Sequence, residues 1–123
     1  MLKLGPIKNE KETENIFKQK GFKYSEYSGC VKAQNGEKTE GLCLYELTNE
    51  KITILYIEPT TDIPLADGIL RSTLHIAAER SILNAFYGDK MSEDFLNKIG
   101  FIKSKAEKTL DIDKLFKSCC GCQ

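Results

Sequence analysis

The strongest pattern in the chain is an apolar run from Ile52 to Glu58, followed after a short loop by an amphipathic stretch from Leu65 to Ser81. The run shows little alternation between apolar and polar residues, so it predicts a strand with both faces covered. The longer stretch has apolar residues at the three- and four-residue spacing of a helix with one broad apolar face. This order places a helix N-terminus at the end of a buried strand, where α/β proteins bind anionic groups.

The residues on either side predict a mixed α/β domain. Asn9 and Ser92 stand where a side chain can cap the first turn of a helix, and Gly21 and Gly100 stand where a helix can end in the left-handed conformation. An Asn35-Gly36 pair between two apolar runs is a strong hairpin signal. The other expected elements are strands over 2–7, 29–33, 41–47 and 84–87, helices over 9–20 and 92–99, one or two short strands within 101–112, and a helical turn at 113–117.

Length and composition indicate one globular domain. The chain has 123 residues, 41% of them hydrophobic, so we expect a single domain over residues 1–118 and a cysteine-rich tail over 119–123. The 18 basic and 18 acidic residues cancel, which argues against nucleic acid or an acidic membrane surface as the main partner. No signal peptide or membrane span is evident. The five cysteines do not suggest a disulfide framework, which favours a cytoplasmic setting.

Two short motifs carry a family resemblance. Ile57-Glu58-Pro59 ends the predicted buried strand, and Leu96-Asn97-Lys98-Ile99-Gly100-Phe101 ends the predicted short helix. They resemble the V-x-P and Y-x-K-L-G-F sequences of the GNAT superfamily of acyl-coenzyme A N-acyltransferases. With the order of elements over residues 41–102, they imply a GNAT-like α/β fold, in which a mixed, mostly antiparallel sheet has helices on both faces.

The resemblance implies a coenzyme A site at the start of the long helix. In the family, a Q/R-x-x-G-x-G/A loop brings backbone N–H groups to the pyrophosphate there. The matching loop runs from Thr61 to Gly68. Whether Thr61 or Asp62 is aligned with the first position of the motif, the loop does not reproduce the motif's glycines. Pro64 lacks an N–H, and Asp62 and Asp67 add negative charge. By resemblance, the residues expected to contact acyl-CoA through their backbones are Tyr56, Ile57, Ala66, Asp67 and Gly68.

The resemblance also implies a tyrosine four residues before Gly100, able to protonate the leaving thiolate. Leu96 occupies that position and cannot transfer a proton. The remaining candidates for a catalytic role are Tyr56, Glu58 and Tyr87, each of which a structural role would also explain. His75, the only histidine, falls on the polar side of the long helix, so we expect a surface residue and no Ser-His-Asp or Cys-His site.

Cys119, Cys120 and Cys122 form a second group with possible chemistry. Thiolates this close can share a soft metal such as zinc, with Cys43 or Cys30 as a fourth ligand, or act in thiol redox chemistry. The alternative is a reduced, frayed tail. The last four residues also have the format of a prenylation box, but its aliphatic positions hold Gly121 and Cys122. Cys30 and Cys43 fall in predicted strands, where small core residues are expected.

Three hypotheses for function follow. The leading one is an acyl-CoA-dependent N-acyltransferase, acetyltransferase-like, that uses acetyl-CoA or another acyl-CoA and an unidentified amine. The second is a GNAT-fold module that has lost the pyrophosphate loop and binds a partner or a small molecule without catalysis. The third is a metal- or redox-responsive protein that acts through the tail cysteines. The sequence leaves the acyl acceptor and the oligomeric state open.

Overall fold

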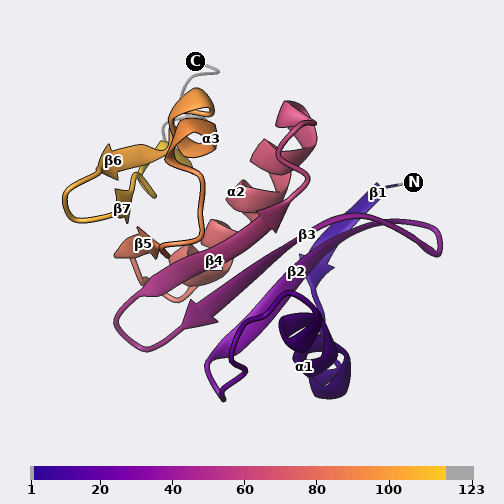
Figure 1. The fold of residues 1–123 in the computed structure, drawn as a ribbon. Helices are drawn as coiled ribbons and strands as arrows, with labels where there is room; N and C mark the ends of the chain where they lie inside the picture. The colour runs from indigo at the N-terminus through magenta and orange to yellow at the C-terminus, as the bar shows by residue number, and fades with distance from the viewer. Residues whose placement is uncertain (1, 116–123) are drawn as a thin grey trace.

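The computed structural model describes residues 2–115, which form one sheet of seven strands flanked by three helices (Figure 1). The mixed α/β class expected from the sequence is therefore confirmed. The elements in chain order are β1 (Leu2–Pro6), α1 (Glu10–Gln19), β2 (Ser28–Asn35), β3 (Lys38–Leu47), β4 (Ile52–Glu58), α2 (Ile63–Glu79), β5 (Ala85–Tyr87), α3 (Glu93–Lys98), β6 (Ile102–Ser104) and β7 (Thr109–Leu110).

The strands lie in the order β1-β2-β3-β4-β5-β7-β6. All neighbouring strands are antiparallel except β4 and β5, which are parallel. Parallel neighbours need a crossover connection, and α2 supplies it. The β2–β3 hairpin turns at Gly36, which has φ +66°, as the Asn35-Gly36 pair predicts. The sheet is mostly antiparallel, as expected.

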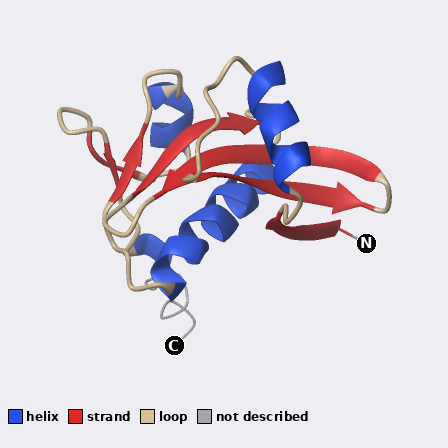
Figure 2. Ribbon diagram, turned by 90° about the horizontal axis from the view of Figure 1, so that it is seen from below, coloured by secondary structure: helices blue, strands red, loops and turns tan. Residues whose placement is uncertain are grey.

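Helices α1 and α2 lie on opposite faces of this sheet (Figure 2). One apolar core lies beneath α2 and another beneath α1. Ile54 and Ile57 of β4 belong to the α2 core, whereas Leu55 and Tyr56 pack with the α1 core. Strand β4 is thus covered on both sides, which explains the lack of polar alternation in its sequence.

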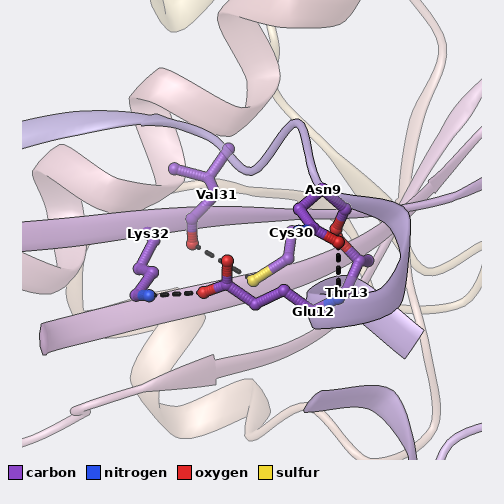
Figure 3. A network of polar contacts seen from close by, with 6 residues as sticks. All are labelled: Asn9, Glu12, Thr13, Cys30, Val31 and Lys32. Carbon is purple, nitrogen blue, oxygen red and sulfur yellow. Dashed lines mark hydrogen bonds and ion pairs between the residues drawn. The ribbon is translucent and has the colours of Figure 1, made fainter. Parts of the chain in front are cut away.

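Capping residues set the helix ends where the sequence predicts them. The side chains of Asn9 and Ser92 accept hydrogen bonds from the N–H groups of Glu12 and Phe95. Gly21 and Gly100 have φ values of +81° and +75° just after α1 and α3. Helix α1 is also tied to β2, because Glu12 pairs with Lys32 at 2.6 Å (Figure 3). No helix in the described range is long and apolar enough to cross a membrane.

Candidate functional site

Strands β4 and β5 run side by side for three residues and then separate. Ile52, Thr53 and Ile54 pair with Ala85, Phe86 and Tyr87. The N–H of Gly88 then donates to the carbonyl of Ile54 at 2.8 Å. Strand β4 continues for four more residues, through Glu58, after this contact. Strand β4 runs on past the end of β5 (Figure 1). The backbone edge of Tyr56 and Ile57 therefore lies past the end of the parallel pairing.

A β-bulge marks the point of separation. Tyr45 of β3 is opposite Ile54, and its neighbour Leu44 is opposite Tyr56, so Leu55 is an extra residue in β4. A bulge of this kind bends the strand and increases its local twist. The bulge and the early end of β5 together open the sheet at one place.

A cleft of about 390 Å³ occupies this opening. One wall is the end of β4 with the loop that follows, and the other is the start of α3 with the loop before it. The lining residues are Tyr56, Ile57, Glu58, Pro59, Thr60, Thr61, Lys90, Met91, Ser92 and Phe95. Its position beside a strand edge and its mixture of polar and apolar groups suit a small organic ligand.

Tyr56, Glu58 and Lys20 form a hydrogen-bonded group at one end of the cleft. The Tyr56 hydroxyl donates to Glu58 Oε1 at 2.6 Å, and Lys20 Nζ lies 2.7 Å from the same oxygen. Hydrogen bonding to Glu58, with some burial, raises the pKa of Tyr56 to about 12. Burial alone would raise the pKa of Glu58, but the bonds from Lys20 and Tyr56 outweigh it and lower that pKa. Near neutral pH the hydroxyl keeps its proton and the carboxylate is ionised.

The ring of Phe22 lies next to two lining residues of the cleft, Tyr56 and Lys90. The rings of Phe22 and Tyr56 lie 6.0 Å apart. Lys20 Nζ lies 5.6 Å from the centre of the Tyr56 ring, and Lys90 Nζ lies 4.9 Å from that of Phe22. Both distances are in the range of cation–π contacts. The structure thus brings together a carboxylate, a phenol and two ammonium groups.

The N-terminus of α2 is largely occupied by its own residues. Asp62 caps the helix, because its side chain accepts from the Leu65 N–H at 3.2 Å and its carbonyl accepts from the Ala66 N–H at 2.9 Å. Pro64 lies in the first turn and has no N–H to offer. Few N–H groups therefore remain for an anion, in agreement with the departure of this loop from the glycine motif.

Ala66, Asp67 and Gly68, the other residues expected to contact acyl-CoA, lie inside α2. Asp67 is paired with Arg71 of the next turn at 2.8 Å. A side chain at Gly68 would face Leu4 of β1. Asp62 and Pro64 line a separate surface hollow with Leu2 and Leu65. Neither Asp62 nor Asp67 is a lining residue of the cleft.

Tyr87 and Leu96 lie outside the cleft. The buried Tyr87 hydroxyl donates to Glu93 Oε2 at 2.7 Å, and burial together with this bond raises the pKa of Tyr87 to about 12. This pair lines a hollow beside Asp89 and Lys108 and is not part of the cleft lining. Leu96 is fully buried in the α2 core. Of the three catalytic candidates, Tyr56 and Glu58 come together and Tyr87 does not join them.

Three residues of this site, Lys20, Phe22 and Lys90, are absent from the sequence predictions. All three lie in loops, and they reach β4 only through long-range packing. No spacing pattern links them to Tyr56. The only sequence feature that could have pointed to Lys20 and Phe22 is their position on either side of Gly21, just after the first helix.

The described cysteines do not suggest a reactive or metal site. Cys30 and Cys43 are fully buried in different cores, and burial raises the pKa of each thiol to about 12. They are core residues, as expected, and their burial argues against either as a fourth zinc ligand. The described residues contain no group of three or more His, Cys, Asp or Glu that could hold a metal. Cys119, Cys120 and Cys122 lie outside the described residues.

His75 is exposed on α2, as expected.

Comparison with solved structures identifies the fold. An acetyltransferase assigned to the GNAT family from Desulfovibrio desulfuricans superposes with a TM-score of 0.51 at 12% identity, over 71% of this chain and 72% of that one. YhhK from E. coli, assigned as an N-acetyl transferase and solved in solution bound to coenzyme A, gives a TM-score of 0.54 at 11% identity, over 85% and 94%. No protein-family model and no curated protein sequence matches the chain. The protein therefore has the GNAT fold.

Proposed function

We propose that the protein is a divergent member of the GNAT superfamily that binds acyl-CoA in the cleft between the end of β4 and the start of α3 and transfers the acyl group to an amine. The observation that carries this proposal is the opening of the sheet after Ile54, which exposes the β4 edge at Tyr56 and Ile57 beside a cleft. The solved structure of YhhK bound to coenzyme A supports a ligand of this class.

The β4 edge fits the amide-rich part of such a ligand. Past the bulge, backbone groups of Tyr56 and Ile57 can bond to the pantetheine arm as a further strand would. Acyl-CoA supplies an activated thioester when it is bound. The chain supplies the groups that move protons around that thioester, namely the Glu58 carboxylate and the Tyr56 hydroxyl.

Glu58 and Tyr56 take complementary roles in this proposal. Glu58 is ionised at neutral pH and accepts a proton from the incoming amine, directly or through water. Tyr56 keeps its proton because its pKa is raised to about 12, so its hydroxyl can donate to the departing sulfur. The two groups share a hydrogen bond of 2.6 Å, which lets a proton pass between them.

The start of α2 contributes less to binding than in a glycine-loop protein. We propose that the backbones of Ala66, Asp67 and Gly68 face the pyrophosphate side of the ligand with little direct N–H donation, because Asp62 and Pro64 leave few donors there. Affinity for the nucleotide half of acyl-CoA is then low, and the pantetheine half supplies most of the binding.

A calorimetric titration with acetyl-CoA tests the binding step. The expected result is a saturable heat with one ligand per chain. Thr60→Trp fills the cleft from an exposed loop position and is expected to abolish the heat, whereas Thr39→Trp, an exposed position outside the cleft lining, is expected to leave it unchanged. Absence of heat and of any thermal shift with the natural chain, at millimolar ligand, would disprove the proposal.

A second candidate is a module with this fold that binds without catalysis. The capped start of α2 and the burial of Leu96 at the acid position favour it. Thiol release from acetyl-CoA, measured with a panel of primary amines, separates the two. Release that depends on the amine and is lost in Tyr56→Phe supports the enzyme, and binding without release for every amine supports the module.

A further inference from the structure

The chain itself places a primary amine beside Glu58, a lining residue of the proposed acyl-CoA cleft. Lys20 follows directly after α1, and its ammonium lies 2.7 Å from Glu58 Oε1. Glu58 is a lining residue of the cleft and also of the groove along α1, where Lys20 lies. The carboxylate therefore lines both cavities, and Lys20 approaches it from the groove along α1.

The surroundings of Lys20 hold its amine in this place. Its Nζ lies 5.6 Å from the centre of the Tyr56 ring, and its side chain is only 28% exposed. Glu58 can accept a proton from the ammonium, and the Tyr56 hydroxyl is bonded to the same oxygen of Glu58. Lys20 thus has beside it the same two groups that the proposed transfer reaction uses.

We propose that Lys20 is an acyl acceptor of the protein itself, modified on Nζ by acyl-CoA bound in the cleft. The inference rests on the proposed function. A reacting pair held in one place has a high effective concentration, so this lysine reacts ahead of lysines that meet acyl-CoA only by diffusion. The product is an Nε-acyl-lysine at position 20.

The reaction balances without a further reagent. The Lys20 ammonium passes one proton to Glu58, and the free amine attacks the thioester carbonyl carbon. A C–N bond forms and the C–S bond breaks, with the electron pair leaving on sulfur. The second proton lost from nitrogen ends on that sulfur as the coenzyme A thiol, and Glu58 returns its proton to water. The step releases one proton and converts a cation into a neutral amide.

Acylation has a direct consequence for the cleft. The neutral amide can no longer form the ion pair with Glu58, so one of the two bonds that stabilise the ionised carboxylate is lost. Glu58 then keeps only the Tyr56 hydroxyl as a partner among those described above. An acylated chain therefore presents its carboxylate to an incoming amine without competition from Lys20.

The chain contains matched internal controls for a chemical test. Lys32 forms an ion pair of the same kind with Glu12 at 2.6 Å (Figure 3) and is 16% exposed. Both lysines line the groove along α1, but only the partner of Lys20, Glu58, also lines the cleft, whereas Glu12 does not. Lys38 is 78% exposed. If exposure alone governed reactivity, Lys38 would react first, whereas the proposal places Lys20 first. Lys90 is a further control, because it lines the cleft but its ammonium lies over the Phe22 ring.

The test incubates the full chain with acetyl-CoA and measures acetylation at each lysine by peptide mass spectrometry. Lys20 is expected to be modified at least about tenfold faster than Lys32 and Lys38. Its rate should saturate with acetyl-CoA and fall at least about tenfold in Glu58→Gln. With acetyl phosphate in place of acetyl-CoA, Lys20 should not be modified faster than the other two lysines. Equal rates at Lys20 and Lys32, a rate that never saturates, or preferred modification of Lys90 would overturn the proposal.

A footprint separates failure of this inference from failure of the proposed function. Desulfo-coenzyme A, which carries no acyl group, is expected to protect Lys20 from acetic anhydride while Lys32 and Lys38 react as before. Protection of Lys20 without its acetylation by acetyl-CoA would leave the binding site standing and refute self-acylation. No protection, together with no heat in calorimetry, would refute both.

Discussion

At the scale of single residues, Asp62 decides how well α2 can bind an anion. Its side chain uses the Leu65 N–H, and its negative charge lies at the positive end of the helix dipole. Asn caps a helix about as well as Asp, so Asp62→Asn removes the charge while keeping the cap. This substitution is expected to tighten coenzyme A binding by about two- to fivefold.

Acetylpantetheine, which has no nucleotide, provides the control for Asp62→Asn. Calorimetry should show the same affinity for it in the variant and in the natural chain. Equal tightening for both ligands would show that the effect does not come from the pyrophosphate and would contradict this account of the loop.

Gly41 is required where β3 passes the end of β4. A Cβ there would lie 2.6 Å from the Glu58 carbonyl and 2.7 Å from Ile69 Cδ1. Gly41→Ala is therefore expected to lower the free energy of unfolding by about 1–3 kcal/mol, measured by urea denaturation. Gly5→Ala is the control, because a Cβ at Gly5 meets nothing within 4 Å, and its change is expected to stay within about 0.5 kcal/mol. An equal loss in both variants would contradict the contact.

Glu58 gives the stability a defined pH dependence. Its pKa in the folded chain is lowered from 4.5, so the stability that its ionised form adds is fully present above about pH 4.5 and is lost as pH falls through the lower, folded value. Urea midpoints should therefore differ between the natural chain and Glu58→Gln at neutral pH and converge in acid. A difference that stays constant with pH would rule out this contribution.

At the scale of elements, the chain is strained two residues after the end of α2. Ser81 has φ +61°, and the Ile82 N–H donates to the Ala77 carbonyl across it, which is the geometry that glycine favours at a helix end. Ser81→Gly is expected to raise the free energy of unfolding by about 0.5–1 kcal/mol. Ser72→Gly, in the interior of the same helix, is expected to lower it by a similar amount. Thermal denaturation of both variants checks the opposite signs.

The sequence predicts elements well where one local signal decides them. The bounds of β4 match the expected run from Ile52 to Glu58, because an unbroken apolar run has few alternatives. The expected helix from Leu65 to Ser81 is instead Ile63 to Glu79, since the Asp62 cap and Pro64 at the first turn start it earlier. The bulge at Leu55, which opens the site, has no sequence signal because it depends on pairing with β3.

At the scale of the whole molecule, the fold was predictable and the site only partly so. Tyr56 and Glu58 were candidates because they end the buried strand. Lys20 and Phe22 reach them only because α1 packs across the face of the sheet that carries Tyr56. Such contacts depend on long-range packing, which no spacing in the sequence records.

A titration followed by 1H–15N NMR tests directly whether acyl-CoA binds in the cleft between the end of β4 and the start of α3. On addition of acetyl-CoA, saturable shifts are expected to be concentrated at residues 56–61, 90–92 and 95, which line the cleft from its two walls. Shifts that are absent at saturating ligand, or that are confined to the hollow around Leu2 and Leu65, would contradict it.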